Sequence, residues 1–394
     1  MELTELSIRL RTLAVFRKLL SDPVIESLCT YLDCLENGFP QMTASSYAEF
    51  VSRLYAAGHG DLGLHIQRIV EEDENVYIRM AAQGLEPPDY MRRCVEMELE
   101  TLQGAADLSP WMLQFGLEGI PLPDFGSAPV RLAECYQKRL ENLGQFGYGI
   151  YARNHMFYLS AKGHIVPVLH PDSTMLGDLV DYKREQQIIW DNTKALLAGK
   201  PAANILLTGD AGTGKSSTVK AVVNELYREG LRILEVRKEQ LHDIPAVLDE
   251  LSVNPLKFIL FIDDLSFQKD DDNYSSLKAV LEGSVSAKSQ NVVIYATSNR
   301  RHLVKEKFSD REGDDIHRND TMQEILSLSE RFGIRITFQK PDKATYLDIV
   351  HHLADAAGVP LSRGELDAAA ERFALGRGGR SARAARQFID NLTV

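Results

Sequence analysis

Apolar residues in the first third of the chain recur every three or four positions, which predicts amphipathic helices. One such stripe comprises Leu3, Leu6, Leu10, Leu13 and Leu20. A second follows Thr43, which we expect to cap its helix, and ends before Gly58. A third begins after the proline pair at 87–88. These stripes predict a mostly α-helical N-terminal domain over residues 1–129, with no indication of its function.

The period of the pattern changes after residue 130. Residues 130–175 predict a connecting helix followed by a β-hairpin, in which MFYLS and IVPVL flank AKGH. Over residues 176–341, apolar strands alternate with helices, which predicts an α/β domain with a parallel sheet covered by helices on both faces. The strand-like runs are ANILLTG, RILEV, FILFIDD, NVVIYATSN and GIRITF. Residues 342–394 return to helices rich in alanine and arginine.

The first of these strands leads into a glycine-rich loop, GDAGTGKSS, with the spacing G-x-x-x-x-G-K-S. Glycines let successive backbone N–H groups approach phosphate oxygens, and the lysine adds a positive charge for the β- and γ-phosphates. The serine hydroxyl that follows is a ligand for Mg²⁺. The loop therefore predicts a nucleotide site made by Gly209, Asp210, Ala211, Gly212, Thr213, Gly214, Lys215, Ser216 and Ser217.

Two later strands also end in polar residues. FILFIDD ends in Asp263 and Asp264, and NVVIYATSN ends in Asn299. Because α/β sheets bind ligands at the carboxyl ends of their strands, we expect these side chains near the phosphate loop. Asp263, with Ser216, is the candidate ligand set for Mg²⁺. Asn299 would lie beside the γ-phosphate and orient a water molecule.

In this order and spacing, GDAGTGKS, FILFIDD and YATSN resemble the Walker A, Walker B and sensor 1 motifs of AAA+ ATPases. LFIDDLSF, YATSNRRHL, SLSERFG and GGRSARAARQFID are more narrowly similar to a bacterial AAA+ family known only as domain of unknown function 815. The resemblance covers roughly residues 130–394. It implies an AAA+ P-loop core with a small C-terminal helical lid, which binds ATP with Mg²⁺ and hydrolyses it to remodel a macromolecular target.

The resemblance also implies roles for residues outside these strands. Val180 and Tyr182 match the segment that cradles adenine, and Arg383 matches the lid arginine that senses the γ-phosphate, with Arg380 as the alternative. Arg331 matches an arginine finger that acts on the site of a neighbouring subunit, so the resemblance implies a homo-oligomer.

Asp264 departs from the Asp-Glu pair of most such ATPases, because it is one methylene shorter than glutamate. We expect slow hydrolysis, since phosphoryl transfer depends mainly on positioning and charge stabilisation. An ATP-gated binding module with little or no hydrolysis is the alternative. A GTPase is disfavoured because ATSNRRHL contains no guanine-reading motif, and a threading unfoldase because EVRKEQLHDIPAVLDELSVN lacks an aromatic-glycine loop.

The composition limits which binding partners and cellular locations we expect. The formal net charge of −12 argues against a general nucleic-acid binder, and no run of apolar residues is long enough for a membrane span. A basic cluster at Arg300, Arg301 and His302 leaves a local nucleic-acid contact open without supporting one. The four cysteines lack paired CxxC spacing, which favours free thiols and a cytoplasmic location.

Overall fold

The computed structural model describes residues 2–393 except for residues 59, 115–116, 118, 266–271, 283–289 and 300–329. The chain forms two compact units, Met1–Arg153 and Asn154–Val394. The sequence-based boundaries differ, because they placed a separate connecting segment at 130–175. In the structure the helical part of that segment packs into the core of the first unit, and its hairpin joins the sheet of the second.

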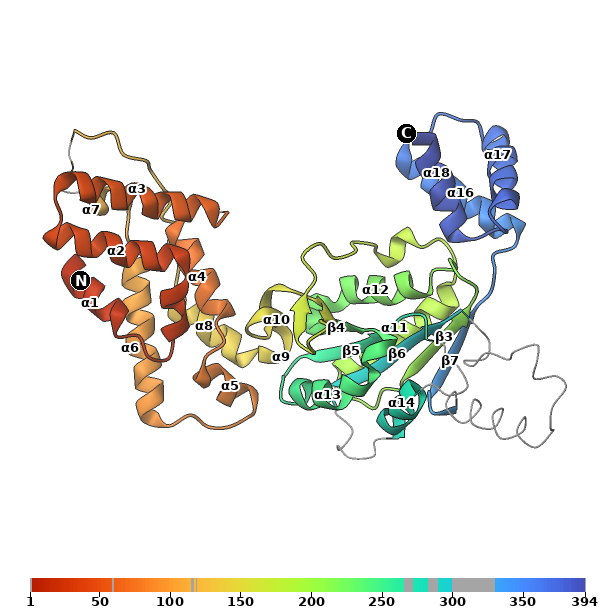
Figure 1. Cartoon of the computed structure of the whole chain (residues 1–394), viewed down its shortest axis with the longest axis horizontal. Helices are drawn as coiled ribbons and strands as arrows, with labels where there is room; N and C mark the ends of the chain where they lie inside the picture. Colours follow the sequence, from red (N-terminus) through yellow and green to blue (C-terminus); the bar gives the residue numbers. More distant parts are fainter. Residues whose placement is uncertain are drawn as a thin grey trace. The chain divides into compact units, whose positions relative to one another are not determined.

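The first unit is helical, as its apolar stripes predict, and one hydrophobic core holds it together. From the first stripe, Leu6, Leu10 and Leu13 are at most 2% exposed. Figure 1 shows this unit in red to yellow. Its elements are α1 Leu3–Arg11, η1 Arg17–Ser21, α2 Pro23–Asn37, α3 Pro40–Ala56, α4 Leu62–Glu72, α5 Val76–Ala82, α6 Asp89–Ala106, α7 Pro110–Leu113, α8 Leu132–Glu141, α9 Leu143–Phe146 and α10 Ile150–Arg153.

One helix boundary differs from the sequence prediction. Helix α3 begins at Pro40, so Thr43 lies inside the helix and the prediction that it caps the helix was wrong. Proline is well suited to the first helical position, since its fixed φ matches the helix and its missing N–H is not needed there. The Thr43 hydroxyl donates instead to the carbonyl oxygens of Phe39 and Cys34, each at 3.2 Å.

The second unit is built on a seven-stranded sheet with the order β2-β1-β4-β5-β6-β3-β7. Among the strands that the structure describes, the β1–β2 hairpin is antiparallel and the remaining neighbours run parallel. The strands are β1 Met156–Leu159, β2 Ile165–Pro167, β3 Ile205–Gly209, β4 Leu231–Val236, β5 Lys257–Ile262, β6 Val292–Ser298 and β7 Ile334–Phe338. Each strand-like run of the sequence is therefore a strand, and the predicted parallel sheet is confirmed.

Helices cover both faces of this sheet (Figure 1). Alternate strand residues such as Ile205, Leu207 and Ile259 pack in one core with α11 and α12. The residues between them, such as Leu206 and Leu260, are also at most 2% exposed, so both faces are buried. The elements around the sheet are η2 Leu176–Asp178, α11 Lys183–Leu197, α12 Lys215–Leu226, η3 Tyr227–Glu229, η4 Lys238–Asp243, α13 Ile244–Ser252 and α14 Asp272–Glu282.

Strand β3 lies where the order of the sheet reverses. From β3 the chain moves to β4 on one side, whereas β7, the last strand, pairs with β3 on its other side. Parallel sheets bind ligands at such a switch point, outside the carboxyl ends of the strands. The topology therefore places the glycine-rich loop, which follows β3, at the expected ligand position.

The chain ends in a small helical bundle with its own apolar core, which we call the lid. It consists of α16 Lys343–Ala357, α17 Arg363–Gly376 and α18 Ala382–Thr393. Val180, from the segment before α11, packs against the lid core. The predicted architecture, an α/β core with a mostly parallel sheet covered by helices, a C-terminal helical bundle and a mostly helical N-terminal region, is confirmed. Among the described residues, no helix is long and apolar enough to cross a bilayer.

Candidate functional site

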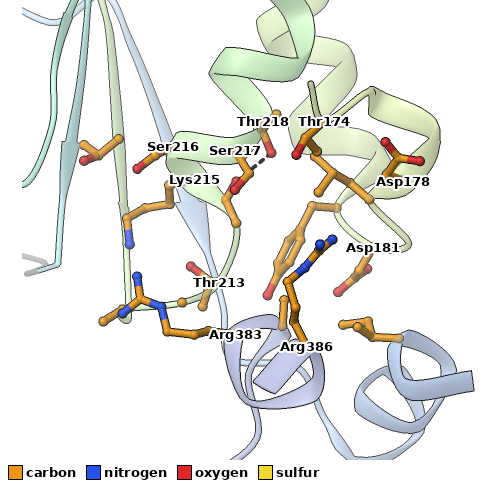
Figure 2. A pocket seen from close by; sticks show the side chains of 18 of the residues that line it. Thr174, Asp178, Asp181, Thr213, Lys215, Ser216, Ser217, Thr218, Arg383 and Arg386 are labelled. Atoms are coloured by element: carbon orange, nitrogen blue, oxygen red, sulfur yellow. Dashed lines mark hydrogen bonds between the residues drawn. The ribbon is translucent and has the colours of Figure 1, made fainter. Parts of the chain in front are cut away.

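A cleft of about 610 Å³ opens beside the glycine-rich loop. Its lining comes from residues 172–186, which we call the strap, from the loop and the start of α12, from the ends of β5 and β6, and from the lid. This volume falls in the range of small-molecule sites. Figure 2 shows the cleft with the start of α12 on one side and the lid helix that carries Arg383 and Arg386 on the other.

The glycines of the loop are required by its backbone. Gly209, Gly212 and Gly214 have φ values of 140°, 80° and 93°, a region that side chains strongly disfavour. A Cβ at Gly209 would lie 2.1 Å from the carbonyl oxygen of Phe338, and one at Gly212 would lie 2.9 Å from the Cβ of Arg383. The loop therefore touches both the neighbouring strand and the lid.

The same backbone leaves a row of donors available. Within the described residues, no hydrogen bond is donated by the backbone N–H groups of residues 211–217. The next N–H, of Thr218, donates to the carbonyl oxygen of Gly214 at 2.9 Å and continues the helix. A run of unpaired N–H groups at a helix N-terminus binds anions, because the groups and the helix dipole both favour negative charge.

Lys215 connects the loop to the neighbouring strand. Its Nζ donates to the carbonyl oxygens of Gly209 and Asp210, at 2.8 and 2.9 Å, and to Oδ1 of Asn299 at 3.0 Å. The side chain is only 5% exposed, and this burial lowers the pKa of Lys215 below 10.5, against the opposing charges of Asp263 and other acids. A nearby anion would raise the pKa again, so the lysine is set up to gain from binding one.

The first acid is tied to the loop. Asp263 follows β5, and its Oδ1 accepts hydrogen bonds from Ser216 Oγ at 2.7 Å and from Thr297 Oγ1 at 2.5 Å. A hydroxyl and a carboxylate at this separation are oxygen ligands of the kind that Mg²⁺ prefers. Ser216 and Asp263, predicted as the metal ligands, therefore lie in hydrogen-bond contact.

The second acid has an unusual backbone. Asp264 has a φ of 53°, which places it in the left-handed region. Its N–H donates to Thr297 Oγ1 at 2.9 Å, and its Oδ1 accepts from Nδ2 of Asn299 at 2.7 Å. Asn299 therefore contacts both Lys215 and Asp264. The three polar strand ends that the sequence suggested are joined by direct hydrogen bonds.

The two candidate sensor arginines, Arg380 and Arg383, differ in their surroundings. Arg380 makes two hydrogen bonds to Glu371, at 2.8 and 2.7 Å, and is absent from the cleft lining. Arg383 lines the cleft and extends toward Lys215 (Figure 2), close enough that its charge contributes to lowering the Lys215 pKa. Arg383 therefore faces the glycine-rich loop across the cleft, whereas Arg380 is bonded within the C-terminal bundle.

The strap forms the other wall of the cleft. Val180 and Tyr182, the predicted adenine contacts, both line it. The ring of Tyr182 lies 4.8 Å from the Phe338 ring, and its hydroxyl donates to the carbonyl oxygen of Gln339. Val180 packs against the lid core, so one short segment connects the lid to the sheet. An apolar wall of this kind suits a planar base.

Two groups of predicted residues lie elsewhere. Gly209, Asp210 and Arg331 are not part of the cleft lining, although the first two belong to the loop, and Arg331 lies just before β7. The basic cluster at 300–302 falls outside the residues that the structure describes.

The lining residues that the sequence analysis missed include Thr297, Arg386 and Asp172. The first two could have been predicted from the sequence, because Thr297 is part of YATSN and Arg386 follows Arg383 by one helical turn. Asp172 lay in a segment without any pattern. Burial acts to raise the pKa of Asp172, but hydrogen bonds from Thr174 and the charges of Lys220 and Arg386 hold it below 3.8.

Part of the chain is similar to solved structures. Three structures of the Thermotoga maritima RuvB Holliday junction branch migration motor are similar: the motor itself, a proline-to-glycine variant and an arginine-to-alanine variant. Their identities are 16%, 18% and 16%, and their TM-scores 0.36, 0.38 and 0.38. The matches cover 53%, 53% and 56% of this chain and 61%, 60% and 64% of the RuvB chains, which is less than two thirds of their length.

No curated protein matches the chain. The model of the family described as "Protein of unknown function (DUF815)" matches residues 152–394, which is more than half of the chain and includes the whole cleft. The chain therefore belongs to the DUF815 family, as the motifs in its sequence predict.

Proposed function

We propose that the cleft binds Mg²⁺-ATP and that the protein hydrolyses it slowly to drive a conformational change or the remodelling of a macromolecular target. One observation carries the proposal: Ser216 is hydrogen-bonded to Asp263, and Lys215 to Asn299, which in turn contacts Asp264. Side chains from the ends of β5 and β6 meet those of the anion-binding loop. Phosphoryl transfer requires this kind of positioning of charged and polar groups around the phosphates.

The shape of the cleft supports a nucleotide. The N–H groups of residues 211–217 would bind the phosphates, and the wall that contains Val180 and Tyr182 would hold the base. The lid closes the site from the other side, where Arg383 is directed toward Lys215 (Figure 2). A guanidinium always carries its charge, and its planar donors match phosphate oxygens.

The residues present fit a magnesium ion. Ser216 Oγ and Asp263 Oδ1 lie 2.7 Å apart, and both residues line the open cleft, where water can complete the coordination. Ser216 and Asp263 would hold the ion, which supplies positive charge next to the β- and γ-phosphates. Asp264 and Asn299 are exposed to the cleft and are placed to orient a water molecule.

The oligomeric state is a further part of the proposal. Arg331 lies outside the cleft lining, which is consistent with a role in the site of a neighbouring subunit. We expect ATP to increase the particle size in light scattering. We also expect a mixture of the inactive Arg331→Ala and Lys215→Ala proteins to recover activity, because each would complete the other's site. A particle that stays monomeric with ATP while turning over at full rate would contradict this arrangement.

The central test is nucleotide binding and phosphate release by the full chain. Wild type should bind ATP with Mg²⁺, and Lys215→Ala should lose most of this affinity. Lys220→Ala is the matched control, because this lysine lies on the same helix, pairs with Glu235 at 3.4 Å and is not part of the cleft lining. A wild-type protein that shows neither calorimetric heat nor thermal protection with ATP would refute the proposal.

The alternative is an ATP-gated binding module, and Asp264 is the feature that favours it, because it is shorter than the usual glutamate and is already bonded to Asn299. Binding without turnover at any protein concentration would support this alternative. Affinity capture with a hydrolysis-blocked variant held in ATP would then identify the target, which we expect to be cytoplasmic.

A further inference from the structure

Thr297 stands out among the residues that line the cleft and have no role so far. It is the residue before the end of β6, and only 2% of its surface is exposed. It lies beneath the two acids rather than on the open surface of the site. Its neighbours in space, Asp263 and Asp264, come from the end of the adjacent strand, β5.

The hydroxyl of Thr297 makes one bond to each acid, and the directions of both bonds are fixed. A backbone N–H can only donate, so the N–H of Asp264 donates to Oγ1 over 2.9 Å. The single hydroxyl proton is then directed to Oδ1 of Asp263 over 2.5 Å, which requires this oxygen to accept. One side chain therefore sets the rotamer of the first acid and the backbone of the second.

The bond to Asp264 has a specific consequence for the backbone. Asp264 occupies the left-handed region, which residues other than glycine adopt only when their surroundings hold them there. Thr297 contributes twice, because its carbonyl oxygen also accepts from the N–H of Leu265 at 2.7 Å. The left-handed turn is thus fastened on both sides of the residue whose carboxylate contacts Asn299.

The bond to Asp263 affects the candidate metal site. Oδ1 of Asp263 accepts from both Thr297 and Ser216, and within the described residues no group donates to Oδ2. The two donors fix the orientation of the carboxylate and leave its second oxygen available to a cation. Ordering of this kind around a metal ligand typically changes affinity or activity by 10–100-fold.

We infer that Thr297 is the positioning residue of this two-acid site, and that its hydroxyl sets both the Mg²⁺ affinity through Asp263 and the rate of hydrolysis through Asp264. The inference rests on the proposed function, since it concerns the same cleft. Thr297 itself does not contact the nucleotide. It acts by holding two carboxylates that come from another strand.

The test compares Thr297→Val, which keeps the shape and removes the hydroxyl, with Thr297→Ser, which keeps the hydroxyl. Thr337→Val on β7 is the matched control, because its hydroxyl bonds to Thr208 at 2.9 Å and it does not line the cleft. For each protein we would measure the Mg²⁺ concentration for half-maximal binding of a fluorescent ATP analogue, the analogue's affinity in EDTA, and kcat. Circular dichroism checks folding, and Thr297→Ala replaces the valine variant if that one does not fold.

Thr297→Val should need about ten times more Mg²⁺ and lose ten- to a hundredfold in kcat, with affinity in EDTA unchanged within about twofold. Thr297→Ser should recover both values to within about threefold, and Thr337→Val should match wild type. The inference is overturned if wild type binds Mg²⁺ and nucleotide but Thr297→Val behaves like it, or if serine rescues no better than valine.

A wild type that binds with Mg²⁺ but shows no turnover would overturn only the hydrolytic part of the proposed function, and the Mg²⁺ titration would still decide the role of Thr297 at the metal. A wild type that binds no nucleotide would overturn the proposed function together with this inference. The outcomes are therefore distinguishable.

Discussion

Asp264 distinguishes hydrolysis from simple nucleotide binding, and replacing it with asparagine removes its charge with little other change. Asparagine tolerates the left-handed region as well as aspartate does, so the φ of 53° can persist. An amide oxygen can still accept from Asn299, and the backbone bond to Thr297 is unaffected. We therefore expect the free energy of unfolding of Asp264→Asn to stay within about 1 kcal/mol of wild type.

The effect on catalysis should be much larger. A carboxylate that accepts a proton or a hydrogen bond from the attacking water contributes about 10²–10⁴-fold, and an amide cannot replace it. We expect kcat of Asp264→Asn to fall at least about a hundredfold, while ATP affinity changes by less than about threefold. Steady-state phosphate release at saturating ATP and Mg²⁺ measures the first quantity, and equilibrium titration with a fluorescent analogue measures the second.

Asp264→Glu restores the usual Asp-Glu pair and tests the backbone argument. Glutamate is several-fold rarer than aspartate in the left-handed region, which corresponds to a loss of roughly 1 kcal/mol in stability. Its longer side chain would also have to leave the position in which Asn299 contacts it. We expect Asp264→Glu to be less stable than wild type and no faster. A faster enzyme would refute the backbone argument, and an Asp264→Asn protein with wild-type kcat would refute the catalytic role of Asp264.

Three other predictions concern the lid, the loop and His155, the residue before β1. Arg383→Ala should reduce kcat or ATP affinity about tenfold, whereas Arg380→Ala should lower the thermal midpoint without changing ATP affinity, because Arg380 bonds within the lid. Gly212→Ala should weaken ATP binding about tenfold, because its Cβ would lie 2.9 Å from the Cβ of Arg383 in the lid and its φ is 80°. Gly177→Ala is the control and should be neutral, because nothing lies within 4 Å of its Cβ. Burial lowers the pKa of His155 below 6.5. As the pH falls below 6.5, the unfolded chain therefore binds a proton at this residue before the folded protein does, and the free energy of unfolding should decrease. The decrease should be smaller in His155→Gln.

The sheet was predictable because its strands are buried on both faces. Runs such as FILFI are apolar without alternation, and in the structure all of Phe258 to Ile262 are completely buried. Polar residues directly after such runs then fall at the carboxyl edge, since parallel strands share one direction. For the same reason Asp263 and Asn299 could be placed near the loop from sequence alone.

Other features depend on contacts between segments that are far apart in the sequence. The start of α3 at Pro40 followed from local proline chemistry but competed with Thr43, a residue that suits a cap equally well. The left-handed backbone of Asp264 has no sequence signal of its own, because aspartate occurs in every kind of turn. It follows from a hydrogen bond to Thr297, on a neighbouring strand whose register the sequence does not specify.

The short side chain of Asp264 and its left-handed backbone conformation are related. In a strand-like continuation, a carboxylate one methylene shorter would lie farther from the strand end that carries Asn299. The left-handed turn at Asp264 instead brings its Oδ1 to 2.7 Å from Nδ2 of Asn299. That conformation is one in which aspartate is favoured over glutamate. Asp264 is therefore consistent with a working acid in a rearranged turn, so the shorter side chain by itself does not decide between hydrolysis and ATP-gated binding.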